Sequence, residues 1–218
     1  DHSRLDPAID EAYFPQTGSY FFWSASPYVP NAGEAWGVYF DDPYGGAFPK
    51  GYPRAVRLVR GGPPQALETT PTSDFVLDDV NGIAYHKTTG LTWKRCAEGQ
   101  SWDSANKTCT GTAMTYNWSL ALNRASGGWR LPNINELRSI VERHQWNPAV
   151  NATVFPNMPS TYWSSSPYTP NANNPSAGYV WNVDFYDGYD GPFCSGYACY
   201  VRLVRGGQYS LLSVSKDG

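Results

Sequence analysis

The sequence predicts an α+β fold with two helices, antiparallel strands and long ordered loops, together with a β-rich half-copy of the same unit. Composition is the first reason. Aromatic residues make up 16% of the chain and charged residues only 16%, while glycine (21) and proline (18) are abundant. This mixture favours short strands and many turns over helical bundles. An internal repeat and two helix-start signals are the other reasons.

The repeat links the beginning of the chain to its last third. The hexapeptide WSASPY at residues 23–28 returns as WSSSPY at 163–168, and VRLVRGG at 56–62 is identical to 201–207. Weaker matches pair PAID at 7–10 with PAVN at 148–151, and WGVYF at 36–40 with WNVDF at 181–185. Ordered self-similarity of this kind indicates a repeated structural unit. The later copy carries extra loop residues around Asn173.

The repeat also sets the expected domain boundaries. Nothing in residues 1–6 corresponds to the stretch from Phe75 to Val141, so residues 1–62 are predicted to be the C-terminal half of a first repeat. Residues 63–73 are Pro/Thr-rich and are predicted to be a linker. Residues 74–208 form one complete copy, and 209–218 begin a downstream segment. The exposed core face of the half-copy is expected either to be completed by a preceding segment or to dock on the complete copy.

The elements of the complete copy follow in order. Short strand-like runs cover residues 75–77, 83–86 and 91–93, separated by the turn signals Asn81-Gly82 and Thr89-Gly90. A first helix is predicted over Trp118–Ala125, capped by Thr115 or Asn117.

A second helix is predicted to begin after Pro132. There Asn133 and Glu136 form a capping-box pattern. One face of this helix is apolar and is predicted to be core; it carries Ile134, Leu137, Ile140 and Val141. Strands are then expected at 162–165, 179–186 and 200–204. Of Arg202 and Arg205 on the last strand, at least one is expected near the core, paired with an acid such as Glu136.

Charge and hydropathy exclude two classes of partner. The formal net charge is −3 and no long cluster of lysine or arginine is present, so nucleic-acid binding has little electrostatic basis. No apolar run approaches the roughly 20 residues that span a bilayer, so direct membrane insertion is not expected.

The four cysteines predict two disulfides and a location outside the cytoplasm. They form no C-x-x-C motif, and Cys96–Cys109 and Cys194–Cys199 each enclose a local loop. In the half-copy the counterparts of Cys194 and Cys199 are Pro49 and Arg54, a joint loss that suits a bonded pair. A metal or redox role for these thiols is the less favoured alternative.

The ordered motifs of the complete copy closely resemble the Lcl C-terminal domain family, named for a bacterial collagen-like adhesin. The matching segments are TGLTW (89–93), RCAEGQ (95–100), GWRLPNINELR (128–138), WSS (163–165), VDF (183–185) and VRLVRGG (201–207). The resemblance implies a C-type-lectin-like fold, related also to that of formylglycine-generating enzymes. It further implies an extracellular bacterial binding domain and no catalytic set.

The candidate binding residues lie in loops rich in tyrosine, asparagine, serine, aspartate and glycine, the residues that antibody loops use for adaptable contact. Constant strands that carry altered loops are typical of recognition scaffolds. The candidates are Tyr28, Asn31, Tyr44, Tyr168, Asn171, Asn173, Tyr179, Asp187, Tyr189 and Asp190. Aromatic faces and carboxylates suit a neutral glycan better than a polyanion. The alternative is that these loops merely pack on each other.

Calcium is the one cofactor considered, with Asp184, Asp187 and Asp190 as its ligands, because acidic loop residues at this spacing can bind hard cations. The alternative is that these aspartates form turns. The three histidines His2, His86 and His144 are scattered, so nothing orders a nucleophilic site.

The predicted function is therefore a non-catalytic adhesion module that recognises a surface glycan or a cell-surface protein. The alternatives are a structural repeat unit of a large surface protein or filament, for which self-association is expected, and a formylglycine-generating-type enzyme.

Overall fold

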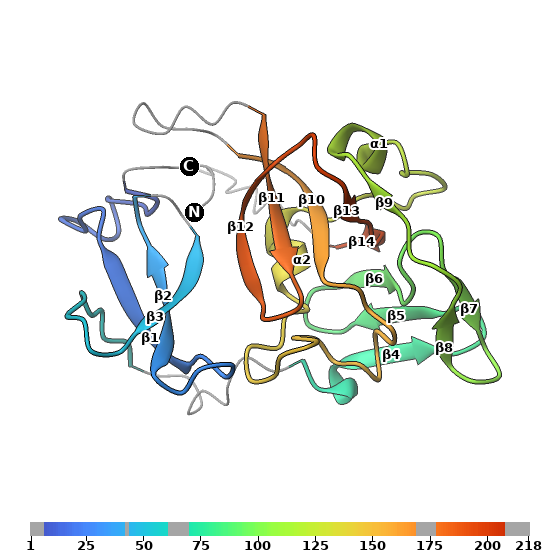
Figure 1. Ribbon diagram of the computed structural model, residues 1–218, viewed down its shortest axis with the longest axis horizontal. Coiled ribbons are helices and arrows are strands. Elements are labelled where there is room, and N and C mark those ends of the chain that lie inside the picture. Colours follow the sequence, from blue (N-terminus) through green and yellow to red (C-terminus); the bar gives the residue numbers. More distant parts are fainter. Residues whose placement is uncertain (1–6, 42–43, 61–69, 169–177, 208–218) are drawn as a thin grey trace, which may run out of the picture.

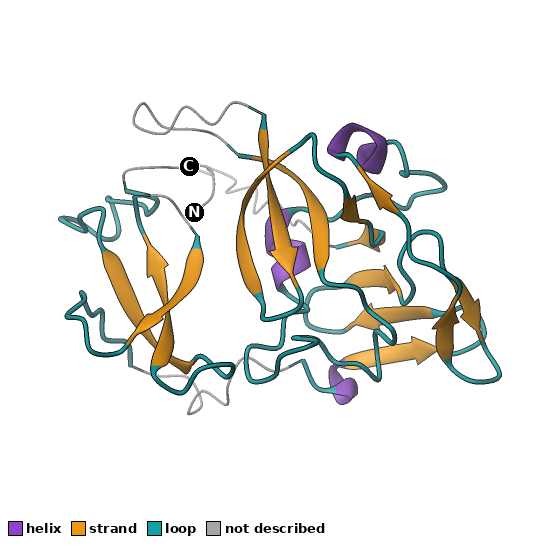
Figure 2. Cartoon of the chain, viewed as in Figure 1, coloured by secondary structure: helices purple, strands orange, loops and turns teal. Residues whose placement is uncertain are grey.

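The computed structural model describes residues 7–41, 44–60, 70–168 and 178–207. In this part of the chain, two short helices accompany mostly antiparallel sheets, so the predicted α+β class is confirmed (Figure 2). The C-type-lectin-like relation stays a prediction. Among the described residues, no helix has the length and apolar content required to cross a bilayer.

The half-copy forms a three-stranded antiparallel meander in the order β1-β2-β3 (Figure 1). Its strands are β1 (Phe21–Pro27), β2 (Glu34–Tyr39) and β3 (Gly45–Pro49). The sheet is held by aromatic packing, because the Phe21 ring contacts both Trp23 and Phe48 edge-on at centroid distances of 5.2 and 4.4 Å.

The complete copy has two main sheets. The first has the order β14-β6-β5-β4 and follows a short 3-10 helix at Thr72–Asp74. Its strands are β4 (Phe75–Asp78), β5 (Ile83–His86), β6 (Leu91–Lys94) and β14 (Val204–Gly206). The first three match the predicted runs closely.

The second sheet has the order β12-β11-β10-β13-β9. Its strands are β9 (Thr115–Tyr116), β10 (Thr161–Pro167), β11 (Tyr179–Asp184), β12 (Tyr189–Cys194) and β13 (Cys199–Tyr200). Strand β12 lies in a segment that was expected to be loop. It can contain Pro192 because it is an edge strand, where a missing N–H costs little.

Both helices are shorter than expected, but their caps are as predicted. Helix α1 (Trp118–Leu122) begins at Asn117, whose side chain accepts a hydrogen bond from the N–H of Leu120 at 3.0 Å. Helix α2 (Ile134–Arg138) begins with the complete capping box of Asn133 and Glu136.

Helix α2 packs against β10 and β11 of the second sheet, and its apolar face is part of the main core (Figure 1). The four predicted core residues of its apolar face, Ile134, Leu137, Ile140 and Val141, are all buried. They pack with Trp93 from the first sheet and Trp181 and Val183 from the second. Three elements thus share one interior, so the complete copy folds as a unit.

The strand pairing of the half-copy repeats that of the complete copy. Strand β1 pairs with β2 as Trp23↔Gly37 and Pro27↔Ala35, with a bulge between. Strand β10 pairs with β11 as Trp163↔Asn182 and Pro167↔Val180, with a bulge at the same place. The sequence repeat is therefore also a repeat of register.

The predicted last strand, 200–204, is divided between the two sheets. Cys199–Tyr200 pairs in one sheet and Val204–Gly206 in the other, because the intervening residues cross the core. Arg202 is the buried arginine, whereas Arg205 is exposed. The expected pairing with Glu136 is wrong, since that carboxylate receives two hydrogen bonds of 2.7 Å from Arg130.

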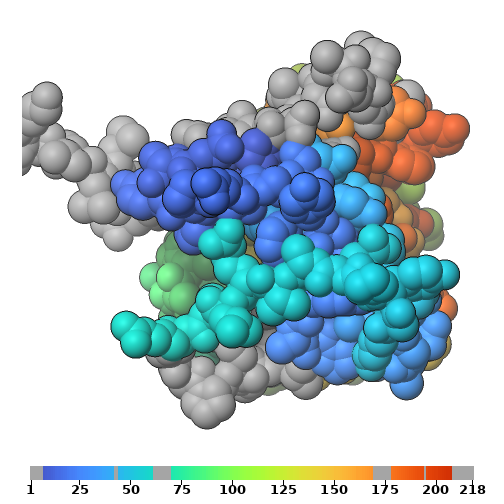
Figure 3. Space-filling view, turned by 90° about the vertical axis from the view of Figure 1, so that its left-hand side faces the viewer, coloured from blue at the N-terminus to red at the C-terminus, as the bar shows by residue number. Residues whose placement is uncertain are grey.

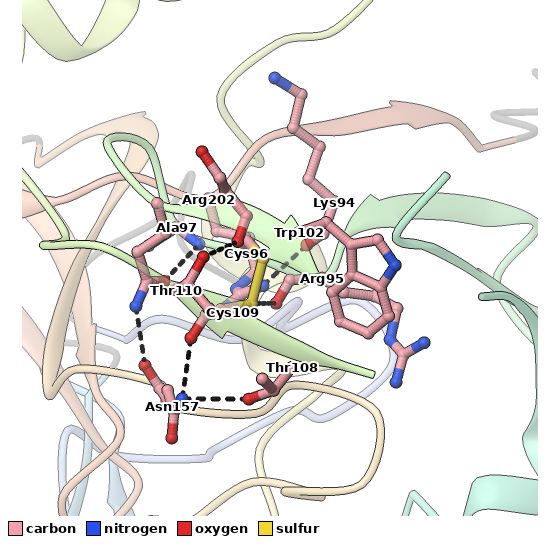
Figure 4. The surroundings of a disulfide bond; sticks show 12 residues. Lys94, Arg95, Cys96, Ala97, Trp102, Thr108, Cys109, Thr110, Asn157 and Arg202 are labelled. Atoms are coloured by element: carbon pink, nitrogen blue, oxygen red, sulfur yellow. Dashed lines mark hydrogen bonds between the residues drawn. A yellow bond between two sulfur atoms is a disulfide. The ribbon is translucent and has the colours of Figure 1, made fainter. Parts of the chain in front are cut away.

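The Cys96–Cys109 disulfide is confirmed and fastens the hairpin of β7 (Ser101–Asp103) and β8 (Thr108–Thr110) to the strand β6 region. Figure 4 shows Asn157 below this hairpin, donating from Nδ2 to Thr108 Oγ1 at 3.1 Å and to the carbonyl of Cys109 at 2.8 Å. The bridge and these bonds hold the hairpin against the body of the complete copy.

The second predicted bridge is not formed, because Cys199 is a free, buried thiol. The side chain of Cys194 lies outside what the structure describes. Cys199 packs in a small core with Trp163 and Leu203 instead of facing the loop, and burial raises the pKa of its thiol to about 12.

The end of the predicted linker is fixed to the complete copy. Thr70 donates from its N–H and its hydroxyl to Glu142 Oε1 at 2.9 and 2.8 Å. Asn151 Nδ2 donates to the carbonyl of Thr70 at 2.9 Å. Residues 61–69, and the downstream segment expected at 209–218, lie outside the described residues.

His86 gives stability a predictable dependence on pH. It is buried in β5, with its ring stacked on Phe75 at 4.6 Å, and burial lowers the pKa of His86 below its usual 6.5. As pH falls through 6.5 the unfolded chain takes up a proton that the folded chain resists, so the free energy of unfolding decreases, until the folded histidine is protonated as well. Urea unfolding at pH 8 and pH 5 should show a larger decrease for the wild type than for His86→Gln. Equal decreases would contradict this assignment.

Candidate functional site

The half-copy docks on the complete copy along a seam between β3 and β12 (Figure 1). This docking leaves the other edge of the half-copy uncovered, where Val56, Leu58 and Val59 are exposed. The guanidinium of Arg143 lies 4.4 Å from the centroid of the Trp36 ring, which is buried. Gly45 of β3 lies beside the buried Asp190, and a Cβ there would be in ordinary van der Waals contact with Asp190 Oδ1 at 3.4 Å.

A buried ion cluster of Asp190, Arg138 and Arg143 lies next to the seam, within the complete copy. Asp190 is fully buried, with Oδ2 3.1 Å from Arg138 Nη2 and Oδ1 3.3 Å from Arg143 Nη2. Its expected place on an exposed contact loop is therefore wrong. Burial of a carboxylate requires cationic partners, and the two arginines supply them.

Tyrosines from both copies meet beside this cluster. Tyr28 donates its hydroxyl hydrogen to Asp187 Oδ2 at 2.9 Å, and its ring packs edge-on against Trp36 at 5.4 Å. Burial, together with this acceptor carboxylate, raises the pKa of the Tyr28 phenol. The rings of Tyr44 and Tyr189 lie 6.4 Å apart, and Tyr44 also stacks on Tyr39 at 5.1 Å.

These side chains surround a hollow of about 320 Å³ at the seam. Its lining consists of Tyr28, Glu34, Trp36, Tyr44, Gly46, Ala47, Phe48, Asp187 and Tyr189. Tyr189 is 38% exposed, so one aromatic wall remains open to solvent. The hollow therefore combines ring faces with two carboxylates, which accept hydrogen bonds.

Four of the ten predicted binding residues converge on this hollow: Tyr28, Tyr44, Asp187 and Tyr189. Tyr168 does not, because it is 5% exposed and packs edge-on against Trp181 within the main core. The prediction of Tyr168 as a contact residue is therefore wrong.

The other predicted residues lie apart from the hollow. Asn31 is exposed and accepts a hydrogen bond from the N–H of Gly33 at 3.0 Å, which makes it a turn residue. Tyr179 begins β11 and is 36% exposed. Asn171 and Asn173 fall outside the described residues.

The predicted calcium site is not formed. Among the described residues, no three histidine, cysteine or acidic side chains are grouped closely enough to hold a metal ion. Asp184 Oδ1 accepts from the N–H of Tyr186 at 2.8 Å, and Asp187 Oδ1 from that of Tyr189 at 3.0 Å. Asp190 pairs with arginines. Two of the three aspartates thus serve turns, and the third serves the ion cluster.

Sequence reasoning missed Glu34, Trp36 and Arg143 at the seam. The sequence repeat identified Trp36 as the counterpart of Trp181, but it did not identify Arg143 as the residue that packs on Trp36. Arg143 carries no local signal, because its contact with Trp36 joins residues more than a hundred positions apart in the chain.

A larger hollow, of about 530 Å³, is lined in part by Arg138 and Arg143. Its walls also include His86, Asn135 and Ser139, and none of its lining residues is a tyrosine or tryptophan. The seam hollow is the better candidate for a ligand, because it offers aromatic faces together with hydrogen-bond acceptors.

These features define a class: a disulfide-stabilised α+β module with an aromatic, carboxylate-bearing hollow at its edge. The family model of the Lcl C-terminal domain matches residues 82–205, and the chain belongs to this family. No curated protein and no solved structure matches the chain. Membership of this family points to an adhesin-related module, and the Cys96–Cys109 disulfide is consistent with an extracellular location.

Proposed function

We propose that this chain is a non-catalytic, extracellular binding module of a bacterial surface whose seam hollow takes a neutral glycan. The observation that carries the proposal is the convergence of Tyr28, Tyr44 and Tyr189 with two carboxylates, Glu34 and Asp187, in one hollow. Each copy supplies part of the hollow, so binding would depend on the two copies being docked.

The chemistry of the hollow suits sugars. A pyranose ring presents an apolar C–H face that packs on a tyrosine ring, while its hydroxyl groups donate to carboxylate oxygens. Asp187 already receives hydrogen bonds from Tyr28 and from the N–H of Tyr189, which fixes its orientation. A carboxylate held in place loses little conformational freedom when a ligand binds.

Electrostatics disfavour an anionic ligand. Glu34 and Asp187 both line the hollow, and the formal net charge of the chain is −3. A sulfated or carboxylated glycan would meet repulsion in this hollow, so a neutral oligosaccharide is the class of ligand that fits best.

A glycan array probed with the full chain tests the proposal. Binding to neutral glycans is expected, with a loss of about five- to tenfold for Tyr44→Ala and for Tyr189→Ala, since each removes a stacking face worth about 1–1.5 kcal/mol. Tyr52→Ala is the matched control, because Tyr52 is 61% exposed and lies outside the hollow. Unchanged glycan affinity in both Tyr44→Ala and Tyr189→Ala, or an equal loss of affinity in Tyr52→Ala, would contradict the proposal.

A structural repeat is the second candidate function, favoured by the docking of successive copies through the seam itself. In that case the aromatic residues would serve contacts between copies in a long surface protein. Sedimentation of the full chain distinguishes the two, because a spacer is expected to self-associate and a glycan-binding module to remain monomeric at the same concentration.

A further inference from the structure

The same heptapeptide occupies two opposite environments in this molecule. In the complete copy Val201, Leu203 and Val204 are 0%, 1% and 0% exposed. Their counterparts in the half-copy, Val56, Leu58 and Val59, are 62%, 89% and 90% exposed. Because residues 56–62 and 201–207 are identical, the difference comes entirely from the surroundings.

The exposed segment is held in its repeat position. Ala55 forms a parallel bridge with Phe22, as Tyr200 does with Tyr162 in the complete copy. The following arginine keeps its aromatic cradle in both copies. Arg57 lies 5.2 and 5.9 Å from the ring centroids of Phe14 and Phe22, and Arg202 lies 4.8 and 5.5 Å from those of Phe155 and Tyr162.

The complete copy shows what covers this segment. The N–H of Lys94 donates to the carbonyl of Leu203 at 3.0 Å, and Val204 and Arg130 exchange two backbone hydrogen bonds of 2.9 Å. Strand β14 then pairs with β6, with Arg205 opposite Thr92. All these partners belong to the front half, residues 75–141. In the described part of the half-copy, residues 56–60 form no strand.

The seam does not supply this cover. The half-copy docks through β3, whereas Ala55 bridges to β1, at the other edge of the three-stranded sheet (Figure 1). In Figure 3 the turquoise segment that ends the half-copy lies on the outside of the molecule. An edge with exposed apolar side chains and available backbone groups is a template for strand pairing.

We infer that residues 55–60 are a docking edge for a further front-half unit, a polypeptide with the sequence pattern of residues 75–141. Such a unit would pair a β6-like strand with residues 59 and 60 and cover Val56, Leu58 and Val59. The front half present in this chain cannot serve, because its β6 already pairs with β14. For the same reason an intact second copy of the chain is not the occupant.

The test adds a second copy of residues 70–145 ahead of residue 1 of the full chain, through a flexible glycine-serine linker. In the added unit Thr92 is changed to cysteine, and in the half-copy Arg60→Cys is introduced. These positions correspond to the opposed pair Thr92 and Arg205. A disulfide between the two cysteines, found by non-reducing peptide mapping, is expected only if the strands pair in this register. Amide exchange at residues 58–60 should slow by tenfold or more.

Two controls complete the test. Arg57→Cys in place of Arg60→Cys puts the thiol out of register, and little cross-link is expected. Leu58→Asp with Val59→Asp, combined with the Arg60→Cys arrangement, should abolish both the cross-link and the protection. An added unit that folds without either signal overturns the inference. An added unit that stays unfolded also overturns it, since the half-copy should supply the strand that this unit lacks.

Discussion

Arg202→Ala is expected to lower the free energy of unfolding by about 3–5 kcal/mol. The guanidinium is fully buried, lies over Phe155 and Tyr162, and donates from Nη1 to the carbonyl of Lys94 at 2.7 Å. Alanine would leave a cavity between the two rings and would remove the Nη1 donor from the part-buried carbonyl of Lys94.

An opposing effect reduces this loss without reversing it. Desolvation disfavours the charged guanidinium, and burial accordingly lowers the pKa of Arg202. Its removal recovers that penalty, but the cavity and the lost hydrogen bond to the Lys94 carbonyl remain, and the cavity is costly in a close-packed interior. The net effect is therefore destabilising.

Arg57→Ala is the matched control, because Arg57 has the same sequence neighbours and the same aromatic cradle but is exposed. Its loss should cost no more than about 1 kcal/mol. Urea denaturation of both variants, followed by tryptophan fluorescence, measures the difference. Similar effects in the two variants would show that burial by the front half is not what makes Arg202 important.

Removal of the Cys96–Cys109 bridge by a double change to alanine is expected to cost about 3 kcal/mol. The bond joins residues separated by 13 positions, so its loss releases a loop in the unfolded chain. Both sulfur atoms also belong to buried residues, and alanine fills that space less well. Thermal unfolding in the presence and absence of a reducing agent provides the measurement.

The reducing agent distinguishes loss of the disulfide from a destabilisation caused by the alanine substitutions themselves. It should lower the midpoint of the wild type to about that of the double variant, and it should leave the double variant unchanged. Cys199→Ala serves as the comparison, because Cys199 is a buried free thiol and its removal breaks no covalent link. A midpoint of the wild type that does not respond to reduction would contradict a stabilising role for the bridge.

Several features of this protein were predictable because their causes are local. The capping box of Asn133 and Glu136 involves residues three positions apart. The Cys96–Cys109 bridge closes a short loop. The repeat was visible as sequence segments that occur twice in the chain. These repeated segments form strand pairs with the same register, β1–β2 and β10–β11.

The candidate site was predictable only in part. Residue type identified Tyr28, Tyr44, Asp187 and Tyr189, since tyrosine and aspartate suit adaptable contact. Residue type could not distinguish them from Tyr168 and Asp190. These two are also a tyrosine and an aspartate in neighbouring segments, but they are buried. The partners Trp181 and Arg138 that bury them approach only after folding.

The sequence by itself determined the repeat, the helix caps, one disulfide and the α+β class, because each depends on residues close in the chain or on patterns that recur along it. The tertiary structure alone decided which copy of VRLVRGG is buried, where the two copies meet, and which tyrosines face the hollow. Those outcomes depend on contacts between distant segments. Identical residues therefore reach opposite environments according to whether a front half covers them.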